Sequence, residues 1–560
     1  MSANNLLKIG SSSDKSYHIH PSYLSFKHVN PVMYGLEKEL SPQEVEAIKN
    51  GFRRSTFTEE ALITDYLRGE VPKHDVIKDE HYRKALEVTT NLFKPKEQYR
   101  PVSFPDLRYY PWTLPTSAES PYTFDPYWKE YVKEKYEQGL IQDERITFHN
   151  LYNEIFTHNR EKVHRIKDGI YVDRHGNDLK YHNQAHARSH LVESTEEDKI
   201  RMVFGVPKLL LQVETMFLWP LINDLVNRDS PMLWGFETLK GGWYKMYRWM
   251  SEHPIPSTYL AFDWKQFDKR AQFTIIDDIH DIIKSYIDFE HGYIPTHEYP
   301  ESWTEPERLH RLFDWMRIAI KHTPDLLPNG DMYVRQHAGI ASGFFQTQLL
   351  DSMYNTIILL TILSSLGFNI YTLKIKVQGD DSIIGLLEPI AEPLHTSFMD
   401  LFAKESERRF GAILNVKKSK MSCTLNGLPL LGFTNHHGLP TRSRDELLAS
   451  LLYPERKSDE SRLMARCIGI AYANCGYHPQ IYRVCNDIFC YLEEKGFSPN
   501  SAGLPDLIRF METVNFGELN IDLTKFPSFY ETFNRLTQIP ERSKSQKEKF
   551  WPTTQFLSTY

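Results

Sequence analysis

Two adjacent carboxylates stand at the centre of the stretch KIKVQGDDSIIGLL, residues 374–387. The residues on either side of Gly379 are largely apolar or β-branched, which predicts a short β-hairpin whose turn carries Asp380 and Asp381. Two neighbouring anions repel each other unless a cation or solvent screens them. An isolated Gly-Asp-Asp is more often an ordinary exposed turn, so the metal-site interpretation depends on further ligands elsewhere in the chain.

A third carboxylate is available in the stretch LAFDWKQFDKR, residues 260–270. Asp263 ends an apolar strand predicted over residues 259–262, and Asp268 lies five residues further on. If Asp263 lies beside the hairpin, three carboxylates can hold two Mg²⁺ ions about 3.5 to 4 Å apart, the spacing that serves the attacking and leaving oxygens of phosphoryl transfer. Oxygen-only ligation suits Mg²⁺. Taken alone, Asp263 would be interpreted as a helix cap or a strand-end carboxylate.

Polar residues at helical spacing follow in GIASGFFQTQLLDSMYN, residues 339–355. The pattern predicts a small-residue loop over 339–343 that opens a long helix. Thr347, Asp351 and Asn355 lie four residues apart, so they share one face of that helix. A solvated face is the alternative interpretation, but so apolar a helix is expected to be buried, and a buried polar stripe needs partners.

Two cationic stretches complete the set of candidate groups. The alternation in KIRMVF, residues 199–204, puts Lys199 and Arg201 on one strand face, with Lys208 further along. Such cations would neutralise a nucleoside triphosphate and its departing pyrophosphate. The stretch LNVKKSKMS, residues 414–422, holds three lysines, one of which could donate a proton to the leaving group. Each stretch alone would be interpreted as solvated surface.

The composition is that of a large globular protein, with 560 residues, of which 41% are hydrophobic and 25% charged. The formal net charge of -7 excludes a strongly basic exterior, so any nucleic-acid site must be a local positive lining. All five cysteines lie in the last quarter without a Cys-x-x-Cys pair, which favours reduced thiols in a cytosolic compartment. The first residues lack a signal-peptide pattern, and the most apolar segment, residues 356–363, is too short to span a bilayer, so we expect no membrane entry.

Several elements must position these groups. A capping box over residues 41–44 predicts a helix to about residue 53. Seven prolines among aromatic residues over 95–126 predict an irregular segment that wraps over a larger body. Further helices are predicted over residues 127–140, 210–227, 243–251, 274–289, 305–321 and 393–409, after Gly343, and through most of the chain beyond residue 445.

Each motif alone is a weak signal, but their order along the chain is highly specific. A cationic strand, Asp-x4-Asp, a Ser-Gly loop with its helix, a Gly-Asp-Asp hairpin and a lysine turn follow one another between about residues 199 and 444. In this order the sequence closely resembles the RNA-dependent RNA polymerases of RNA viruses. Four motifs resemble in particular those of the polymerases of double-stranded RNA viruses of the partitivirus type: DWKQFDKR, GIASGFFQTQLLDSMYN, VQGDDSIIGL and LLGFTNHHGLPTRS.

The resemblance implies that Asp263, Asp380 and Asp381 are metal ligands, with Mg²⁺ as the cofactor and Mn²⁺ as its substitute. It also implies that Asp268 reads the ribose 2′-hydroxyl, because a carboxylate accepts that hydrogen bond whereas an aromatic side chain would exclude ribose. The other substrate contacts implied are Lys199, Arg201 and Lys208 for the triphosphate, and Ser342, Gly343, Thr347, Asp351 and Asn355 for the ribose and the template.

Three further details follow from the resemblance. Lys418 is expected to be the catalytic lysine, because its spacing from Asn415 best matches the family. Many polymerases of this class have Asn where this chain has Asp351; a carboxylate accepts but does not donate a hydrogen bond, so Asn355 is expected to take over part of that role. Residues 430–433 with Arg442 resemble the motif that grips the growing strand.

The fold implied is α+β, a closed right hand with fingers, a palm built on an antiparallel sheet, and a helical thumb. The expected domains are an N-terminal extension over 1–95, fingers over 96–255 with the cationic strand at 199–208, a palm over 256–440 with a finger insertion at 280–335, a helical thumb over 441–540 and a C-terminal tail over 541–560. The segment before residue 199 would bridge fingers and thumb. The aromatic tail would enter or cover an exit channel, or be disordered.

The function expected is template-directed ribonucleotidyl transfer that replicates and transcribes a viral double-stranded RNA genome. The expected partners are the RNA template and product, ribonucleoside triphosphates and a viral capsid protein, in the host cytoplasm inside the virus particle. One alternative is a reverse transcriptase, against which Asp268 and Gly379 argue. The other is an inactive polymerase-like scaffold that binds only RNA or capsid, which the complete motifs disfavour.

Overall fold

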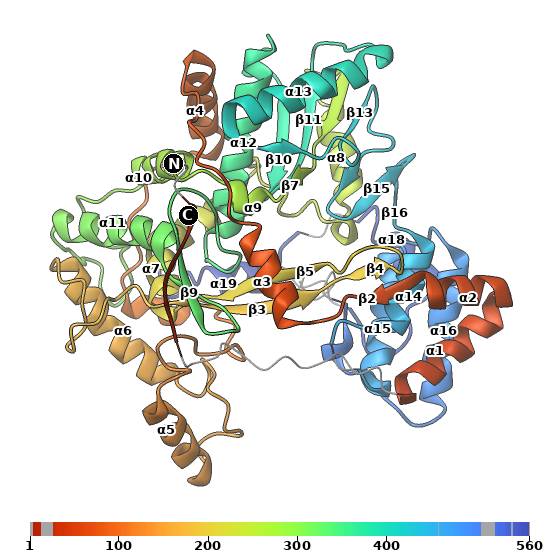
Figure 1. Ribbon diagram of the computed structural model, residues 1–560, viewed down its shortest axis with the longest axis horizontal. Coiled ribbons are helices and arrows are strands. Elements are labelled where there is room, and N and C mark those ends of the chain that lie inside the picture. The colour runs from red at the N-terminus through yellow and green to blue at the C-terminus, as the bar shows by residue number, and fades with distance from the viewer. Residues whose placement is uncertain (1–3, 13–25, 457, 506–520, 539–540, 559–560) are drawn as a thin grey trace.

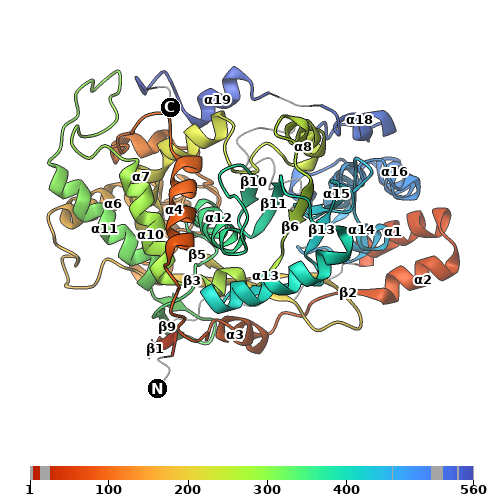
Figure 2. The ribbon, with the colours of Figure 1, turned by 90° about the horizontal axis from the view of Figure 1, so that it is seen from above.

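A four-stranded antiparallel sheet lies at the centre of the protein. The computed structural model describes residues 4–12, 26–456, 458–505, 521–538 and 541–558 (Figures 1 and 2). The predicted hairpin is confirmed, and its second strand pairs with the strand that precedes Asp263. The sheet has the order β10 (Lys374–Gln378), β11 (Asp381–Leu386), β6 (Thr258–Ala261) and β13 (Lys420–Ser422).

Two helices pack behind this sheet. α12 (Thr347–Ser365) is almost wholly buried and lies beside β10, and α13 (His395–Phe410) packs against α12 (Figure 2). The Leu- and Ile-rich sequence of α12 explains its burial on all sides. Its predicted start after Gly343 is confirmed, and α13 agrees with the helix predicted over residues 393–409.

A second, five-stranded sheet joins segments that lie far apart in the sequence. Its order is β1, β9, β8, β3 and β5, so that residues near the start of the chain pair with residues beyond 330. The cationic strand is confirmed as β5, in which Ile200 and Met202 are buried and Arg201 is exposed. The bounds are β1 (Leu6–Ser11), β9 (Asp331–Arg335), β8 (Asp325–Leu326), β3 (Asn183–Ser189) and β5 (Ile200–Gly205).

Helices from both ends of the chain form one lobe, at the right of Figures 1 and 2. Their buried side chains make a second hydrophobic core. The capping box predicted at Ser41 is present, with Glu44 as its partner. A short strand pair, β2 (Phe52–Arg54) with β4 (Leu191–Glu193), leads from this lobe to the rest. The helices are α1 (Phe26–Glu39), α2 (Pro42–Gly51), α14 (Arg444–Leu452), α15 (Glu460–Ala473) and α16 (Pro479–Glu493).

The proline-rich segment wraps over the main core as predicted. Apart from the short turn η1 (Pro105–Tyr109) it is irregular, and its side chains Tyr99, Phe104, Leu107 and Tyr122 are buried. The backbone N–H of Tyr99 donates to a carbonyl of a neighbouring helix end at 3.1 Å, which ties the wrap to the body. Burial of these aromatic side chains stabilises a segment that has little regular backbone bonding of its own.

For the described residues 541–558, the structure corrects the expectation that the C-terminal tail is disordered or enters a channel. After α19 (Lys544–Phe550), Phe550, Trp551 and Phe556 are buried in the main core instead of entering a channel. The indole N–H of Trp219 donates to the carbonyl of Phe550 at 3.0 Å, and the rings of Trp551 and Phe556 stack. The aromatic content that suggested a mobile or channel-lining tail is explained by this packing.

The remaining elements surround the two sheets, and the helices predicted over 127–140, 210–227, 243–251, 274–289 and 305–321 are all present within a few residues.

Among the described residues, α7 (Lys208–Asn227) alone is long and apolar enough to cross a membrane, but 83% of its apolar window is buried inside the fold, as in many core helices. The bounds are α3 (Glu59–Leu67), α5 (Pro126–Glu137), α6 (Tyr152–Lys167), α7 (Lys208–Asn227), α8 (Gly242–Ser251), α9 (Phe267–Arg270), α10 (Phe273–Ser285), α11 (Pro306–His322), α18 (Phe529–Asn534), β7 (Trp264–Lys265), β12 (Ile413–Leu414), β14 (Pro429–Leu430), β15 (Phe433–His436) and β16 (Leu439–Thr441), with short 3-10 turns η2 (Thr238–Lys240), η3 (Glu392–Leu394) and η4 (Ser501–Gly503).

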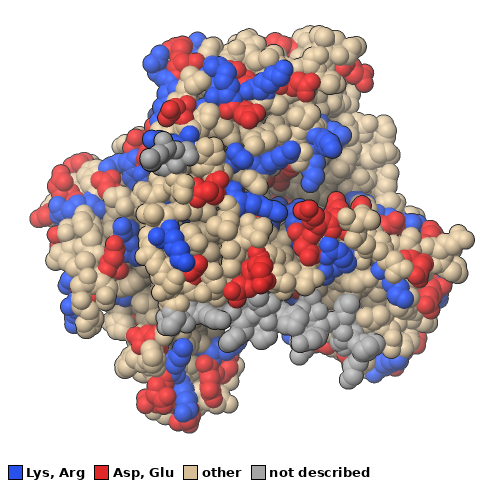
Figure 3. Space-filling model, viewed as in Figure 1, with Lys and Arg blue, Asp and Glu red and all other residues tan. Residues whose placement is uncertain are grey.

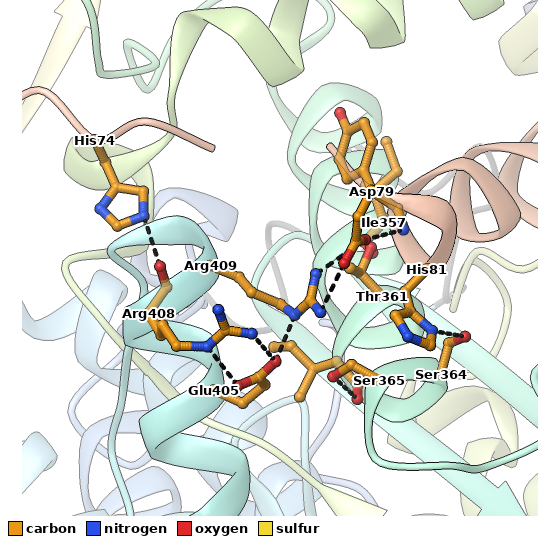
Figure 4. A network of polar contacts seen from close by, with 12 residues as sticks. His74, Asp79, His81, Ile357, Thr361, Ser364, Ser365, Glu405, Arg408 and Arg409 are labelled. Atoms are coloured by element: carbon orange, nitrogen blue, oxygen red, sulfur yellow. Dashed lines mark hydrogen bonds and ion pairs between the residues drawn. The ribbon is translucent and has the colours of Figure 1, made fainter. Parts of the chain in front are cut away.

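A buried ion-pair network attaches α4 (Glu80–Phe93) to the helices behind the central sheet (Figure 4). The guanidinium of Arg409 donates two hydrogen bonds to Asp79, at 3.0 and 3.1 Å, and one to Glu405 at 2.5 Å. Asp79 also accepts the N–H of Tyr82 as the N-cap of α4. One side chain on α13 therefore fixes the start of α4.

Replacing Arg409 by Met is expected to destabilise the protein by about 1–3 kcal/mol, because the carboxylates of Asp79, 38% exposed, and Glu405, 16% exposed, lose their shared cation. The side chain of Arg409 is only 4% exposed, whereas that of Arg408, which also binds Glu405, is 56% exposed. Thermal unfolding of both variants is the measurement. A clear fall of the midpoint for Arg409→Met and almost none for Arg408→Met is expected; equal effects would contradict the role of the buried network.

Candidate active site

The hairpin and β6 bring the predicted carboxylates together. β11 pairs with β6 through Ile384 and Leu260 in antiparallel register. Continued by three residues, this register brings Asp381 opposite Asp263. The negative charge of Asp263 raises the pKa values of both hairpin carboxyls, so the three groups lie within electrostatic reach of one another.

Side chains of α12 hold the turn of the hairpin. The amide nitrogen of Asn355 donates to the carbonyls of Gly379 and Asp380, both at 3.0 Å, and Asn355 accepts the indole N–H of Trp264 at 3.0 Å. The N–H of Gly379, whose φ is +61°, donates to the hydroxyl of Ser352 at 2.8 Å. The structure therefore corrects the predicted ribose contact of Asn355, because its amide is buried and already used.

A turn after β12 holds Asp263. The side-chain amide of Asn415 donates to the Asp263 carboxylate at 2.7 Å, and the Asn415 N–H donates to its carbonyl at 2.8 Å. The N–H of Asp263 donates to the hydroxyl of Ser419 at 3.0 Å. Lys418 lies in the same turn and is exposed. Burial lowers the pKa of Lys199, and the charges of Arg201 and Lys418 add to this shift, so Lys418 lies within reach of Lys199. The lysine turn thus serves first as a support for Asp263.

Sequence reasoning missed the supporting role of Ser352, Trp264, Asn415 and Ser419. Ser352 lies one helical turn before Asn355, so spacing could have placed the two on one face. Trp264 directly follows Asp263, but no local signal shows that its indole N–H donates to α12. These residues hold the carboxylates from behind.

The carboxylate cluster carries an excess of negative charge. Burial, together with the charges of Asp380 and Asp263, raises the pKa of Asp381 to about 7, and burial raises that of Asp380. A divalent cation would relieve this repulsion, and the donors are all oxygens. Among the described residues, no three His, Cys, Asp or Glu side chains already lie at metal-ligand spacing, so a cation would have to draw the carboxylates together.

Asp268 and Asp351 form a second carboxyl pair beside the first. Burial raises the pKa of Asp268 to about 6, with the charge of Asp380 adding to it. Burial and the charge of Asp268 raise the pKa of Asp351 further, and the hydrogen bond between the two carboxyls also favours the protonated form of Asp351. Asp351 therefore keeps its proton and donates a hydrogen bond to Asp268, so it has the donor that Asn would have.

Only two of the three predicted cations face the carboxylates. Burial raises the pKa values of Asp268, Asp380 and Asp381, and the positive charge of Arg201 opposes this rise in each of them; Lys199 lies within reach of Asp263. Lys208 is corrected: it is buried at the start of α7, with its ammonium 5.3 Å from the ring centre of Phe148 and near the charge of Glu119. Pro207 separates it from the strand pattern that grouped it with the other two. Over the face in Figure 3, basic and acidic side chains are interspersed.

The loop over residues 339–343 is attached to both neighbours of the site. Ile340 donates its N–H to the carbonyl of Asp268 at 2.8 Å, and the carbonyl of Ser342 accepts the N–H of Phe204 at 2.9 Å. Gly343 has a φ of +147°, and a Cβ there would lie 2.1 Å from the Phe204 carbonyl, so only glycine fits. The loop is thereby fixed between the ribose candidate and the cationic strand.

Thr347 differs from its predicted role. Its hydroxyl donates to the carbonyl of Ala341 at 2.9 Å and closes the loop at its end. Ser342 instead lines a small cavity of about 60 Å³ together with Asp268 and Arg335. The threonine therefore shapes the loop, while the serine lies beside the carboxyl pair.

A larger cavity of about 540 Å³ lies where the β14–β16 sheet meets the helical lobe. Arg442, Tyr477 and His478 line it, and the guanidinium of Arg442 lies 5.3 Å from the ring centre of Phe433. The predicted grip motif over residues 430–433 thus forms strands at the edge of the lobe.

Comparison with known proteins adds independent findings. A sequence model of viral RNA-dependent RNA polymerases matches residues 154–487. The chain is 32% identical to the RNA-directed RNA polymerase of White clover cryptic virus 1 over 562 aligned residues, which cover 93% of this chain and 91% of that protein. It is 27% identical to the RNA-directed RNA polymerase of Atkinsonella hypoxylon virus over 551 residues, which cover 88% and 81% of the two chains.

Replacing Asp381 by Asn is expected to stabilise the protein at high pH. The folded pKa, about 7, lies above the ordinary value of 3.8, so the wild type loses stability as pH rises from about 4 through 7, and an amide does not. In thermal unfolding without divalent cations, the midpoint of the variant should exceed that of the wild type by more at pH 8 than at pH 5. Each kcal/mol of stability corresponds to about 2–4 °C in the midpoint of a large domain.

The exposed Asp400 provides the control, because Asp400→Asn should show no such pH-dependent gain. Added Mg²⁺ should raise the wild-type midpoint more than that of Asp381→Asn, since the cation replaces the proton as the source of charge relief. A variant advantage that is equal at both pH values would contradict the electrostatic account.

Proposed function

The chain belongs to the viral RNA-dependent RNA polymerase family, and we propose that it extends RNA by attack of a 3′-hydroxyl on the α-phosphate of a ribonucleoside triphosphate, with release of pyrophosphate. It is an RNA-directed RNA polymerase, with RNA and nucleoside triphosphates as its substrates. Its two relatives named above are polymerases of partitiviruses. The observation that carries the mechanism is the meeting of Asp263 with the hairpin carboxylates Asp380 and Asp381, opposite the cationic strand.

Asp263, Asp380 and Asp381 would hold two Mg²⁺ ions, with Mn²⁺ as a substitute. Their all-oxygen donors and mutual repulsion fit divalent cations. When bound, the ions would stabilise charge on the attacking and leaving oxygens. Arg201 and Lys199 would neutralise the triphosphate. Lys418, exposed on the turn beside Lys199, would donate a proton to the departing pyrophosphate.

Ribose recognition is assigned to the carboxyl pair. An ionised Asp268 accepts a hydrogen bond from the ribose 2′-hydroxyl, while the proton on Asp351 stabilises that ionised form. Ser342 lines the cavity beside them and would contact the ribose or the template. Gly343 keeps the loop backbone close to the cationic strand. The same arrangement would penalise a deoxyribonucleotide, because it leaves a buried acceptor unpaired.

The architecture supports a closed right hand. The four-stranded sheet with α12 and α13 would be the palm, the five-stranded sheet the fingers, and the lobe of α14–α16 the thumb. The strand β1 joins the fingers, α1 and α2 join the thumb, and α4 joins the palm, so residues 1–95 would bridge all three.

Two contacts support closure between the proposed fingers and thumb. Arg188 on β3 forms an ion pair with Glu455 at 3.1 Å, and Arg54 donates to the carbonyl of Tyr453 at 3.1 Å. The cavity beside Arg442 is suited to a phosphate of the growing strand, because it lies between the palm edge and the thumb.

The proposal extends to the biological setting. The similarity to two partitivirus polymerases supports replication and transcription of a double-stranded viral RNA genome. We propose that this takes place in the host cytoplasm inside a virus particle, in contact with a capsid protein and without a membrane. The net charge of -7 fits a polymerase whose RNA path is an internal cationic lining.

The purified protein should incorporate ribonucleotides on an RNA template in the presence of Mg²⁺. Asp380→Ala is expected to reduce incorporation by about 100- to 1000-fold or more, because it removes a proposed metal ligand at the reacting phosphate. Asp400→Ala is the matched control, since this exposed aspartate lies on α13 away from the hairpin, and it should keep wild-type activity. Unchanged ribonucleotide incorporation by Asp380→Ala would contradict the proposed mechanism.

A further inference from the structure

One buried carboxylate, Glu214, has no place in the polymerase motifs. It lies in the middle of the apolar helix α7 and is fully buried. In the described part of the chain it forms no ion pair, although an isolated buried carboxylate is costly. Its sequence surroundings, LLLQVETMFLWP, give no local reason for a charged residue.

The partners of Glu214 lie at the start of α12. The backbone N–H groups of Phe345 and Gln346 each donate to its carboxylate at 3.2 Å, and the side-chain amide of Gln346 donates at 3.0 Å. Gln346 is the N-cap residue of α12, and its own side chain does not cap the helix. Glu214 thus supplies, from another helix, the cap that α12 lacks.

The acceptor oxygens of Glu214 are matched to this position. A helix of 19 residues presents partial positive charge at its N-terminus, which stabilises an anion there. Burial raises the pKa of Glu214 to about 8, and the three N–H donors oppose this shift by favouring the charged form. All three contacts require an acceptor, and the carboxyl group receives them on both of its oxygens.

A third residue completes the contact. The side-chain oxygen of Gln346 lies 2.7 Å from Nε2 of His280 on α10, and burial lowers the pKa of His280 to about 4. The imidazole is therefore neutral, and because the amide nitrogen of Gln346 faces Glu214, Nε2 must carry the hydrogen. Three helices, α7, α10 and α12, meet at the end of the loop that carries Ser342.

Through α12, the contact made by Glu214 affects Asp268 and Asp351, the residues proposed to bind the ribose. Asp351 lies one turn into this helix, and its carboxyl is hydrogen-bonded to Asp268. The same loop binds Asp268 at Ile340 and the cationic strand at Ser342. A shift at the start of α12 would therefore move the proton-carrying partner of Asp268.

We infer that Glu214 is a positioning residue for ribose recognition, which caps α12 from α7 and thereby sets the Asp268–Asp351 pair. This inference rests on the proposed function of that pair in binding the 2′-hydroxyl. It adds a residue from a different helix, 54 positions before Asp268, to the determinants of nucleotide choice.

The test compares Glu214→Gln with Thr215→Val in steady-state incorporation of a ribonucleotide and its deoxy analogue on one RNA template. Gln keeps the shape but turns one acceptor oxygen into an N–H donor, which then faces the N–H groups at the start of α12. Thr215 is the matched control, because it is equally buried and bonds only the carbonyl of Leu211 in its own helix. Glu214→Gln should raise KM for the ribonucleotide about 10-fold and lower the ribo-to-deoxy ratio of kcat/KM about 10-fold; Thr215→Val should leave both within about 2-fold.

If Glu214→Gln does not fold, Gln346→Ala tests the same contact, since it removes the side-chain donor and leaves the backbone N–H groups. A fall of about 3-fold in the same ratio is then expected. An unchanged ratio, with activity on both nucleotides reduced equally, would overturn the inference and leave Glu214 a purely structural residue. A wild-type protein without ribonucleotide incorporation or preference would instead contradict the proposed function.

Discussion

Repulsion among three neighbouring carboxylates, Asp263, Asp380 and Asp381, is the constraint on which the structure depends. Burial raises the pKa values of Asp380 and Asp381, and the charge of Asp263 adds to both shifts, so the closeness of the three groups costs free energy until a cation or a proton relieves it. The fold opposes this repulsion with neutral donors. Asn355 holds the hairpin turn through backbone carbonyls, and Asn415 holds the Asp263 side chain. Such contacts keep the carboxylates together without neutralising them.

The helix α12 connects three parts of the site. Its first turn is capped by Glu214, its second carries Asp351, and its third holds the Gly379–Asp380 turn through Asn355. Ribose recognition and metal binding are thus attached to one rigid element. The buried pair between Arg409 and Asp79 adds a clamp behind it, through α13 and α4.

Much of this could be predicted from the sequence, because periodicity and turn chemistry are local. The hairpin over residues 374–387, β5 and the principal helices follow from such patterns. The errors concern partners across the fold. Asn355 and Thr347 were assigned to substrate, yet both bond to backbone carbonyls that only the tertiary structure brings near. Lys208 and the tail side chains Phe550, Trp551 and Phe556 are buried by packing that no spacing rule reports.

The central claim is that the three carboxylates form a metal cage, and anomalous diffraction from crystals containing Mn²⁺ tests it most directly. The account predicts Mn²⁺ peaks between Asp263, Asp380 and Asp381, at metal–oxygen distances of about 2.0–2.2 Å, with the peaks lost in Asp380→Ala. A fully occupied Mn²⁺ site elsewhere, with no density among these three carboxylates when nucleotide and RNA are present, would contradict it.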